Sequence, residues 1–287
     1  MSNDGEGRGS QWEQRLLLSG FIETTQYYQF VEQCEACKEY HDMGVCYGDA
    51  GVGKTLSACR YTQWEQIKRV LAGDLDGAVQ VPSLKMAFYT PEPLVSAKRF
   101  EQEILHLHAQ MKMASSLTLP LAVREARYPR IGYPVVPLEW SLLLIDEADR
   151  LKPMALEVLR DLFDRSQMGV VLIGMSGLER RLKRYPQFYS RVGFLHEFCA
   201  LGVEDLREIF AQQWNLMKQA GDEEVQVGEV LDEEALAAII RITEGNFRLI
   251  HRLLQQVVRI LRINRLTKVT KAVVETARRS LLVGREE

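Results

Sequence analysis

The sequence predicts an α/β fold: a five-stranded parallel sheet flanked by helices, followed by a small helical lid domain. Two observations predict the sheet. The first is an octapeptide between a short apolar run and a helical segment, Gly48-Asp49-Ala50-Gly51-Val52-Gly53-Lys54-Thr55. The second is an apolar run, Leu142 to Ile145, that ends directly at Asp146 and Glu147, as in a strand buried on both faces of a parallel sheet. A third observation predicts the lid: from Gly202 onward the composition changes to charged segments with helical spacing.

Length and composition set the bounds. The 287 residues suffice for one large α/β domain with a small appended domain. Apolar residues make up 46% and charged residues 26%, as in soluble globular proteins, and the net charge is −3. Apolar runs stay well short of the roughly 18 residues of a membrane span, and the N-terminus lacks a secretory signal. Five cysteines without a repeating framework indicate reduced thiols. We therefore expect a cytoplasmic protein without membrane contact.

The elements of the core follow from hydrophobic periodicity. Strands are expected at residues 43–47, 84–89, 141–145, 169–174 and 194–198. Helices are expected at residues 56–71, 94–112, 153–166 and 178–184. Pro153 suits a helix start, where its missing N–H does no harm. Residues 113–139 form a long irregular insert. The chain is thus divided into a disordered N-terminus, 1–11, an α/β core, 12–200, and a lid, 201–287.

The octapeptide has the pattern G-x-x-x-x-G-K-T of a phosphate-binding P-loop. Its glycines let successive N–H groups point at one anion, and the next helix adds its positive N-terminal end. Lys54 supplies a charge at the β- and γ-phosphates, and the Thr55 hydroxyl can ligate Mg²⁺. We expect ATP to contact the whole octapeptide and the following Leu56.

The run that ends at Asp146 has the Walker B pattern. The strand delivers Asp146 to the metal shell, so Thr55 and Asp146 are the expected Mg²⁺ ligands. Glu147 then stands where a carboxylate orients and deprotonates the attacking water. Lys54 and Glu147 are therefore catalytic candidates, and the sequence predicts a Mg²⁺-dependent ATPase.

Cysteine and histidine spacing suggests a second metal site at first sight. Cys34, Cys37 and His41 follow the pattern C-x-x-C-x-x-x-H. This spacing places them on one face of a helix, and a second Cys/His pair with zinc-finger spacing is missing from the sequence. We interpret the cysteines as small core residues.

Charge is unevenly distributed in the predicted lid. Residues 204–234 hold ten Asp and Glu against Arg207 and Lys218, and Asp232 is placed to cap a helix. Residues 241–279 hold ten Lys and Arg but only two Glu, and Gly245 breaks the helical pattern. This basic segment is a solvated face, or it attracts DNA phosphates or an acidic neighbouring subunit.

The motifs occur in a recognisable order: GDAGVGKT, LLLIDEAD, VVLIGMSG, SRVGF and GNFR. This order resembles AAA+ ATPases of the initiator clade over roughly residues 20 to 280. More narrowly, it is similar to the transposition regulators TniB, TnsC and MuB and the IstB-like helpers. The resemblance implies an ATP-dependent homo-oligomer, hexameric or filamentous, that coats duplex DNA without sequence preference. It also implies recruitment of a transposase and of target-selection proteins.

The resemblance also implies roles for residues outside the Walker motifs. Arg191, just before the fifth strand, matches the arginine finger that reaches a neighbour's γ-phosphate, with the basic helix residues Arg180, Arg181 and Arg184 as alternatives. Ser176 matches the polar sensor-1 residue, unless Met175 holds that position. Arg248, three residues after Gly245, matches the sensor-2 arginine.

The resemblance also implies that DNA runs along the inside of the oligomer, beside the segment after the second strand. The implied DNA contacts are Lys98, Arg99, Lys112, Ser115, Ser116 and Thr118. Lys98 and Arg99 open a helix, and the other four lie in the loop after it. Cations and hydroxyls at these positions suit phosphates and do not read base edges. The alternatives are Arg124, Arg127 and Arg130, or the basic C-terminal helices.

Two other classes of function stay open. One is a helicase loader or replication-initiation ATPase, which a neighbouring helicase gene would favour over a transposase gene. The other is a signalling or protein-remodelling ATPase without DNA contact, which DNA-stimulated hydrolysis would exclude.

Overall fold

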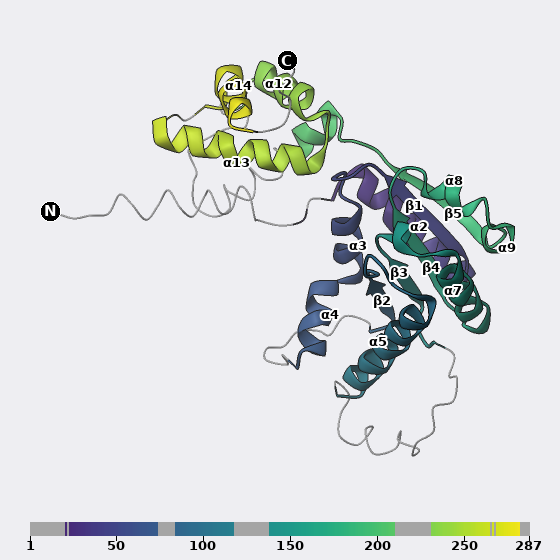
Figure 1. Ribbon diagram of the computed structural model, residues 1–287. Helices are drawn as coiled ribbons and strands as arrows, with labels where there is room; N and C mark the ends of the chain where they lie inside the picture. Colours follow the sequence, from purple (N-terminus) through teal and green to yellow (C-terminus); the bar gives the residue numbers. More distant parts are fainter. Residues whose placement is uncertain are drawn as a thin grey trace. The chain divides into compact units, whose positions relative to one another are not determined.

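The computed structural model describes residues 21, 23–73, 84–117, 138–209, 231–264, 266 and 268–281. The chain forms two compact units (Figure 1). The sheet unit comprises residues 27–48 and 54–198. The helical unit comprises residues 1–26, 49–53 and 199–287, so it includes the tip of the P-loop.

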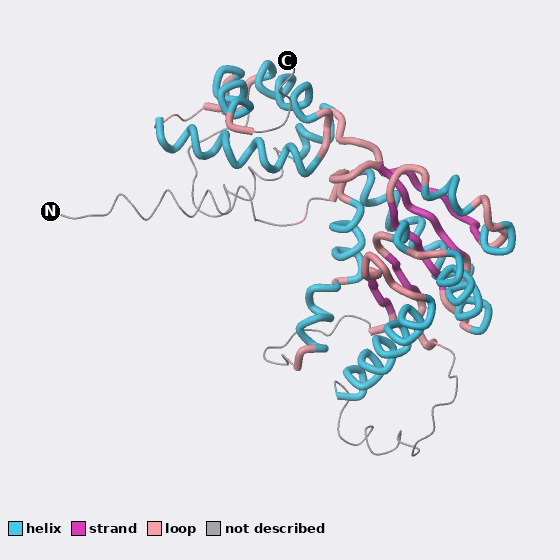
Figure 2. The backbone as a smooth tube through the Cα atoms, viewed as in Figure 1, coloured by secondary structure: helices cyan, strands magenta, loops and turns pink. Residues whose placement is uncertain are grey.

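The sheet unit contains one five-stranded sheet, in the order β2-β3-β4-β1-β5 (Figure 2). All four strand pairs are parallel, which confirms the predicted five-stranded parallel sheet. The strands are β1 (Met43–Gly48), β2 (Met86–Tyr89), β3 (Leu142–Ile145), β4 (Gly169–Gly174) and β5 (Val192–Phe198).

The central strands are buried on both faces. Every residue of β3 and β4 is buried, whereas the residues of the edge strand β5 alternate between half-buried and exposed up to the buried Phe198. Helices lie on both faces of the sheet (Figure 2), and they explain the unbroken apolar runs. Because Tyr47 pairs with Gly174 and Ile145 with Leu172, the carboxyl ends of β1, β3 and β4 lie at one edge.

Helices connect the strands, as parallel pairing requires. They are α3 (Lys54–Thr62), α4 (Trp64–Leu71), α5 (Ala97–Leu117), the short 3-10 helix η1 (Ala148–Arg150), α7 (Pro153–Arg165), α8 (Leu178–Leu182) and α9 (Pro186–Tyr189). Helix α2 (Thr25–Tyr40) precedes β1. Pro153 occupies the first turn of α7, as predicted. Phe100 and Ile104 of α5 and Leu159 of α7 are fully buried in the core.

Two predicted helices differ from the structure. The helix expected at 56–71 is two helices, α3 and α4, because Gln63 between them adopts a left-handed conformation with φ of 53°. The helix expected to end at Lys112 continues to Leu117, because Met111 and Ala114 extend its buried stripe.

This extension corrects a placement in the predicted DNA-contact set. Lys112, Ser115 and Ser116 belong to α5 and do not lie in a loop. Thr118 lies outside the described residues.

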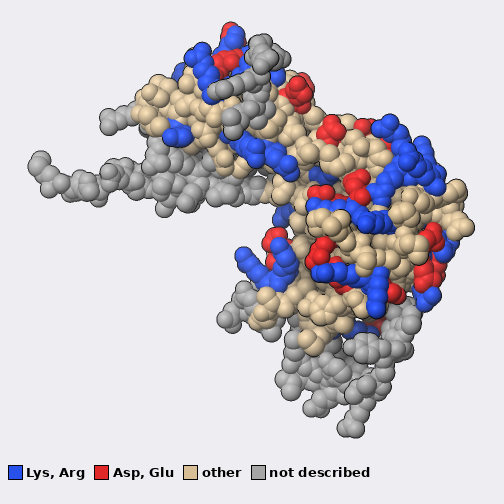
Figure 3. Space-filling view, in the orientation of Figure 1, with Lys and Arg blue, Asp and Glu red and all other residues tan. Residues whose placement is uncertain are grey.

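The helical unit contains α12 (Glu233–Thr243), α13 (Phe247–Asn264) and α14 (Lys271–Arg279), which share one apolar core. Asp232 caps α12 as predicted, since its Oδ1 accepts from the N–H of Ala235 at 2.5 Å. Gly245, with φ of 72°, separates α12 from α13, also as predicted. Lys and Arg side chains gather along α13 on the surface of this unit (Figure 3).

Some predictions fall outside the described residues. They concern the disordered N-terminus 1–11, most of the insert 113–139 with Arg124, Arg127 and Arg130, and much of the acidic segment 204–234. Within the described ranges, a helix both long and apolar enough to cross a bilayer is absent.

Candidate nucleotide site

The P-loop leaves the end of β1 and enters α3. Gly51 and Gly53 have φ of 86° and 105°, which glycine adopts without the steric cost of a side chain. A Cβ atom built on Gly53 would meet nothing within 4 Å, so the loop backbone is accessible there. A tight, accessible loop that leads into a helix N-terminus fits a phosphate group.

Lys54 begins α3 and is only 9% exposed. Its Nζ donates to the carbonyl oxygen of Gly48 at 2.7 Å. The ammonium group is therefore held against the first residue of the loop instead of extending into solvent. Its role at the β- and γ-phosphates stays a prediction.

Thr55 and Asp146 are in direct contact. The Thr55 hydroxyl donates to Oδ2 of Asp146 at 2.7 Å, and Oδ1 of Asp146 accepts from the N–H of Glu147 at 2.9 Å. Asp146 is 4% exposed, and this burial raises the pKa of its carboxyl group. A hydroxyl and a nearly buried carboxylate within 3 Å are oxygen donors of the kind that Mg²⁺ prefers, so the residues present fit this ion.

Glu147 adopts a left-handed backbone conformation, with φ of 51° and ψ of 39°. Such a conformation costs a non-glycine residue of order 1 kcal/mol, and it occurs often at functional sites. The sharp turn starts η1 immediately after β3, and the Glu147 side chain stays 46% exposed beside the buried Asp146. The carboxylate is thus accessible to water, as the predicted role in activating water requires.

A network that the sequence analysis missed fixes the turn after β3. Oδ2 of Asp149 accepts from the N–H of Met175 at 2.7 Å, and Nη1 of Arg150 donates to the carbonyl oxygen of Pro91 at 2.8 Å. The guanidinium group of Arg181 donates to the carbonyl oxygens of Asp149 and Leu151. Together these bonds join the segments that follow β2, β3 and β4.

The same network bears on two earlier expectations. Arg181 was an alternative for the arginine finger, but it binds backbone of its own chain. Met175, the first residue after β4, is held by Asp149 through its N–H, and its side chain is 41% exposed. Ser176 follows it, also exposed. Both lie at the edge of the sheet that carries the P-loop, and the identity of the sensor-1 residue stays a prediction.

Arg191 lies at the opposite edge of the sheet, immediately before β5. Its Nε and Nη2 donate to the two carboxylate oxygens of Asp164 at 2.6 and 2.8 Å. The hydrogen bond from Arg191 is the main reason that the pKa of Asp164 is lowered. Because β5 is parallel to β1, Arg191 cannot act at the P-loop of its own sheet. Any role as a finger requires a neighbouring copy.

Arg248 lies in the first turn of α13, in the helical unit. Its N–H donates to the carbonyl oxygen of Gly51 at 3.1 Å. The side-chain amide of Asn246 donates to the carbonyl oxygen of Ala50 at 2.6 Å, and its oxygen accepts from the N–H of Leu249 at 3.3 Å. Within this unit, the start of α13 therefore binds the loop tip through backbone groups, and the sensor-2 role of the Arg248 side chain stays a prediction.

Comparison with known families agrees with this geometry. A family model described as an AAA domain matches residues 37–182. The chain belongs to this AAA domain family. The AAA chain is also 38% identical over 271 residues to a Staphylococcus aureus protein described as a potential ATP-binding protein, across 92% of the chain and 97% of that protein. The family and this relative both support ATP binding.

Solved structures share the fold of the AAA chain. The RuvB Holliday junction branch migration motor of Thermotoga maritima matches with a TM-score of 0.52 and 18% identity, over 94% of the chain and 74% of RuvB. Drosophila ORC bound to DNA matches with a TM-score of 0.54 and 15% identity, over 96% of the chain and 66% of the ORC chain. The Aeropyrum pernix ORC1 protein in complex with DNA matches with a TM-score of 0.53 and 17% identity, over 93% of the chain and 69% of ORC1. At these identities the likeness shows the fold alone, and it confirms the AAA+ P-loop ATPase fold.

The predicted DNA-contact cations of the AAA chain differ in their surroundings. Lys98 is exposed at the start of α5. Arg99 forms ion pairs with Glu92 at 2.6 Å and Glu103 at 2.7 Å. Lys112 pairs with Glu139 at 2.8 Å. Arg99 and Lys112 are thus partly neutralised by carboxylates of the same chain.

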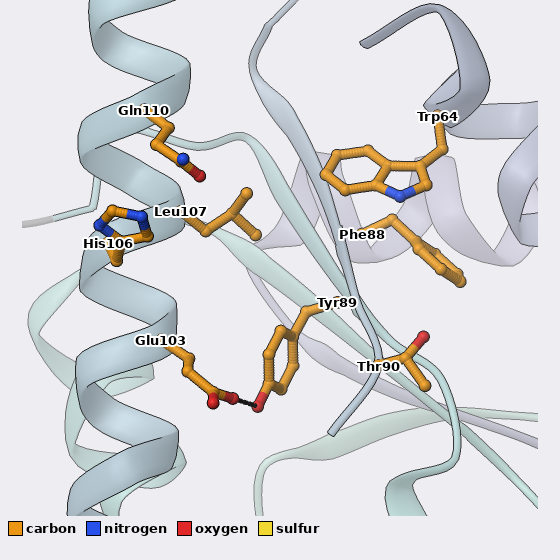
Figure 4. A pocket seen from close by; sticks show the side chains of 8 residues that line it. All are labelled: Trp64, Phe88, Tyr89, Thr90, Glu103, His106, Leu107 and Gln110. Carbon is orange, nitrogen blue, oxygen red and sulfur yellow. Dashed lines mark hydrogen bonds between the residues drawn. The ribbon is translucent and has the colours of Figure 1, made fainter. Parts of the chain in front are cut away.

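A separate pocket of about 300 Å³ lies beside the edge strand β2 (Figure 4). It is lined by Trp64 of α4, by Phe88, Tyr89 and Thr90 at β2, and by Glu103, His106, Leu107 and Gln110 of α5. The Tyr89 hydroxyl donates to Glu103 at 2.6 Å across one end. The lining includes none of the Walker residues, so this pocket is distinct from the nucleotide site.

Proposed function

We propose that this protein is a Mg²⁺-dependent ATPase that hydrolyses ATP to ADP and phosphate. The observation that carries the proposal is the contact between Thr55 and Asp146, which joins the two Walker motifs at 2.7 Å. Glu147 follows Asp146 directly, with an accessible carboxylate. The residues proposed to bind phosphate, to hold the metal and to act as the general base therefore all follow strands of one sheet, which supports the proposal.

Each residue has a distinct task in this proposal. The P-loop backbone and Lys54 bind and orient the phosphates. Thr55 and Asp146 hold Mg²⁺, which when bound neutralises charge on the β- and γ-phosphates. Glu147 orients a water molecule and accepts its proton, and Arg248 and Ser176 sense the γ-phosphate. Arg191 leaves Asp164 and completes the site of a neighbouring copy.

We further propose that the protein assembles on duplex DNA as a hexamer or helical filament and regulates transposition by recruiting a transposase to target DNA. The order of the five motifs, from GDAGVGKT to GNFR, supports transposition. The similar folds of a branch migration motor and of ORC proteins solved with DNA support DNA as the partner. Lys98 is the proposed DNA contact with the least competition from carboxylates.

Hydrolysis assays with and without duplex DNA test this function. We expect Mg²⁺-dependent phosphate release that DNA stimulates, and ring-shaped or filamentous particles on DNA in electron micrographs with an ATP analogue. An ATP hydrolysis rate that duplex DNA does not change, together with micrographs that show no particles on the DNA, would favour the protein-remodelling alternative. Stimulation of a replicative helicase and not of a transposase would favour the loader alternative.

A further inference from the structure

Helix α13 presents one exposed stripe along its length. Arg252, Gln255 and Arg259 are exposed, at spacings of three and four residues that place them on one helix face. The opposite face is apolar, with Leu253, Val257 and Leu261 buried in the core of the helical unit. We call Arg252, Gln255 and Arg259 the α13 stripe. The stripe faces away from the core of the helical unit, because the buried apolar face sets the rotation of α13 about its axis.

Among the described residues, the two arginines of the stripe carry positive charge without local compensation. Helix α13 contains no Asp or Glu. Arg252 and Arg259 have no carboxylate within ion-pair distance among the described residues. Three other cations of the unit are paired: Arg241 with Glu275, Lys271 with Glu234 at 3.2 Å, and Arg207 with Glu233 at 2.8 Å. In Figure 3, blue surface lies at separate places along α13, whereas red and blue surface lie together over α12 and α14.

Intramolecular stability does not account for this arrangement. Arg248 and Arg252 stand four residues apart on the same face, where like charges destabilise a helix by a few tenths of a kcal/mol. A face selected only for solubility would mix both signs, as the paired cations around it do. Unpaired guanidinium groups in a row indicate an external anion.

We propose that the α13 stripe binds the phosphate backbone of duplex DNA. This inference rests on the proposed DNA-binding function and assigns it a second contact surface, in the helical unit. Arg252 and Arg259 lie two helical turns apart, about 10 Å along the axis. Guanidinium groups bind phosphate oxygens in pairs, and Gln255 between them adds an amide donor. Contacts of this kind are independent of sequence, and repetition on each subunit of an oligomer multiplies their effect.

The test compares two charge-matched double variants of the full chain. Arg252→Gln with Arg259→Gln removes two charges from the stripe. Arg241→Gln with Lys271→Gln removes two charges from paired sites of the same unit. Binding of fluorescent duplexes of two unrelated sequences is measured by anisotropy between about 50 and 200 mM salt. For the stripe variant we expect an affinity about tenfold or more lower on both duplexes, and a salt slope smaller by about 2.

The control variant should bind within about twofold of wild type, because exposed ion pairs contribute little. ATP binding should be unchanged in both variants. Arg252→Lys with Arg259→Lys keeps the charges and should retain most of the affinity, which distinguishes a loss of charge from a loss of the arginine side chain. Circular dichroism melts accompany all three proteins.

Three results would overturn the inference. Wild-type protein that binds no duplex even at the lowest salt would overturn the DNA-binding function itself, and the inference with it. Wild-type binding with an unchanged affinity and slope in the stripe variant would overturn the inference alone. A stripe variant that keeps its DNA affinity but loses ATP-dependent self-association in sedimentation without DNA would assign the stripe to an acidic surface of a second copy.

Discussion

The hydroxyl of Thr55 donates to Asp146 at 2.7 Å across a separation of 91 residues. Thr55 is the second residue of α3 and Asp146 directly follows β3, and β4 lies between β3 and β1 in the sheet. The contact therefore depends on the whole strand order and not on local sequence. It also identifies the pair of oxygens at which metal dependence is best tested.

Removing the Thr55 hydroxyl should weaken Mg²⁺ binding more than ATP binding. In Thr55→Ala, the buried Asp146 carboxylate loses its hydroxyl donor and the metal loses a ligand. We expect half-maximal hydrolysis at a Mg²⁺ concentration about 10- to 100-fold higher, the range for lost metal-site interactions. The measurement is a Mg²⁺ titration of phosphate release. Thr55→Ser keeps the hydroxyl and should behave like wild type; equal Mg²⁺ requirements in all three proteins would contradict the site.

Glu147→Gln should separate binding from hydrolysis. The amide keeps the size of the side chain but cannot accept a proton, so hydrolysis should slow by about 10²- to 10⁴-fold while ATP binding persists. Fluorescent ATP binding and phosphate release measure the two quantities. Lys54→Ala is the contrasting variant, because it should lose ATP binding itself. Equal ATP affinity of Lys54→Ala and wild type would refute the P-loop assignment.

Arg191 should act on a neighbouring subunit. Its pair with Asp164 and its place at the far edge of the sheet exclude a role in its own site. Arg191→Ala and Glu147→Gln proteins should each hydrolyse ATP slowly, but their mixture forms interfaces with both residues intact, and hydrolysis should partly recover. Phosphate release is measured across mixing ratios. Absence of recovery while oligomers still form would direct attention to the exposed Arg180 and Arg184.

Lys98 should contribute more to DNA binding than Arg99. Two carboxylates compete with DNA for Arg99, whereas the structure gives Lys98 no such partner among the described residues. Lys98→Ala should weaken binding to every sequence and reduce the salt slope by about 1, and Arg99→Ala should change both less. Lys68→Ala removes an exposed lysine that pairs with Glu65 and serves as the control. The reverse order of effects would show that the pairs of Arg99 open on DNA.

The cysteines should react with thiol reagents in a defined order. Cys199 is exposed, whereas burial raises the pKa of Cys59 to about 11 and that of Cys37 to about 12. Cys34 and Cys46 are fully buried, with their pKa values also raised. Because the thiolate is the reactive form, Cys199 should react fast near pH 8. The buried Cys34, Cys37 and Cys46 should react only after the protein unfolds. Labelling followed by peptide mass spectrometry measures the order. Fast labelling of Cys34 or Cys37 would contradict the burial of α2.

The sequence predicted the parts of the fold that local patterns determine. Apolar runs located all five strands, and the P-loop motif indicated the start of α3, which lies at Lys54 and not at the expected residue 56. Pro153 and Asp232 marked helix starts through the chemistry of single residues. The break at Gln63 was missed because neither glycine nor proline marks it, and the last turn of α5 was missed because Met111 and Ala114 were not counted in its apolar stripe.

Side-chain partners were beyond sequence reasoning. The choice of Asp164 as partner of Arg191, or of Glu92 and Glu103 as partners of Arg99, depends on how helices pack. Asp149 and Arg181 meet through a turn whose geometry no motif encodes. These pairs determine which cations are available to bind another molecule. A count of charges along the sequence therefore located the basic segment but not the unpaired stripe within it.

Because the backbone of Glu147 is left-handed, a substitution at this position can reduce activity without reducing the stability of the fold. Strained residues at functional sites can reduce the stability of the fold while they serve activity. Glycine at this position would lose the carboxylate and also relieve about 1 kcal/mol of backbone strain. Under the proposed function, Glu147→Gly is therefore expected to give a well-folded protein that binds ATP but does not hydrolyse it.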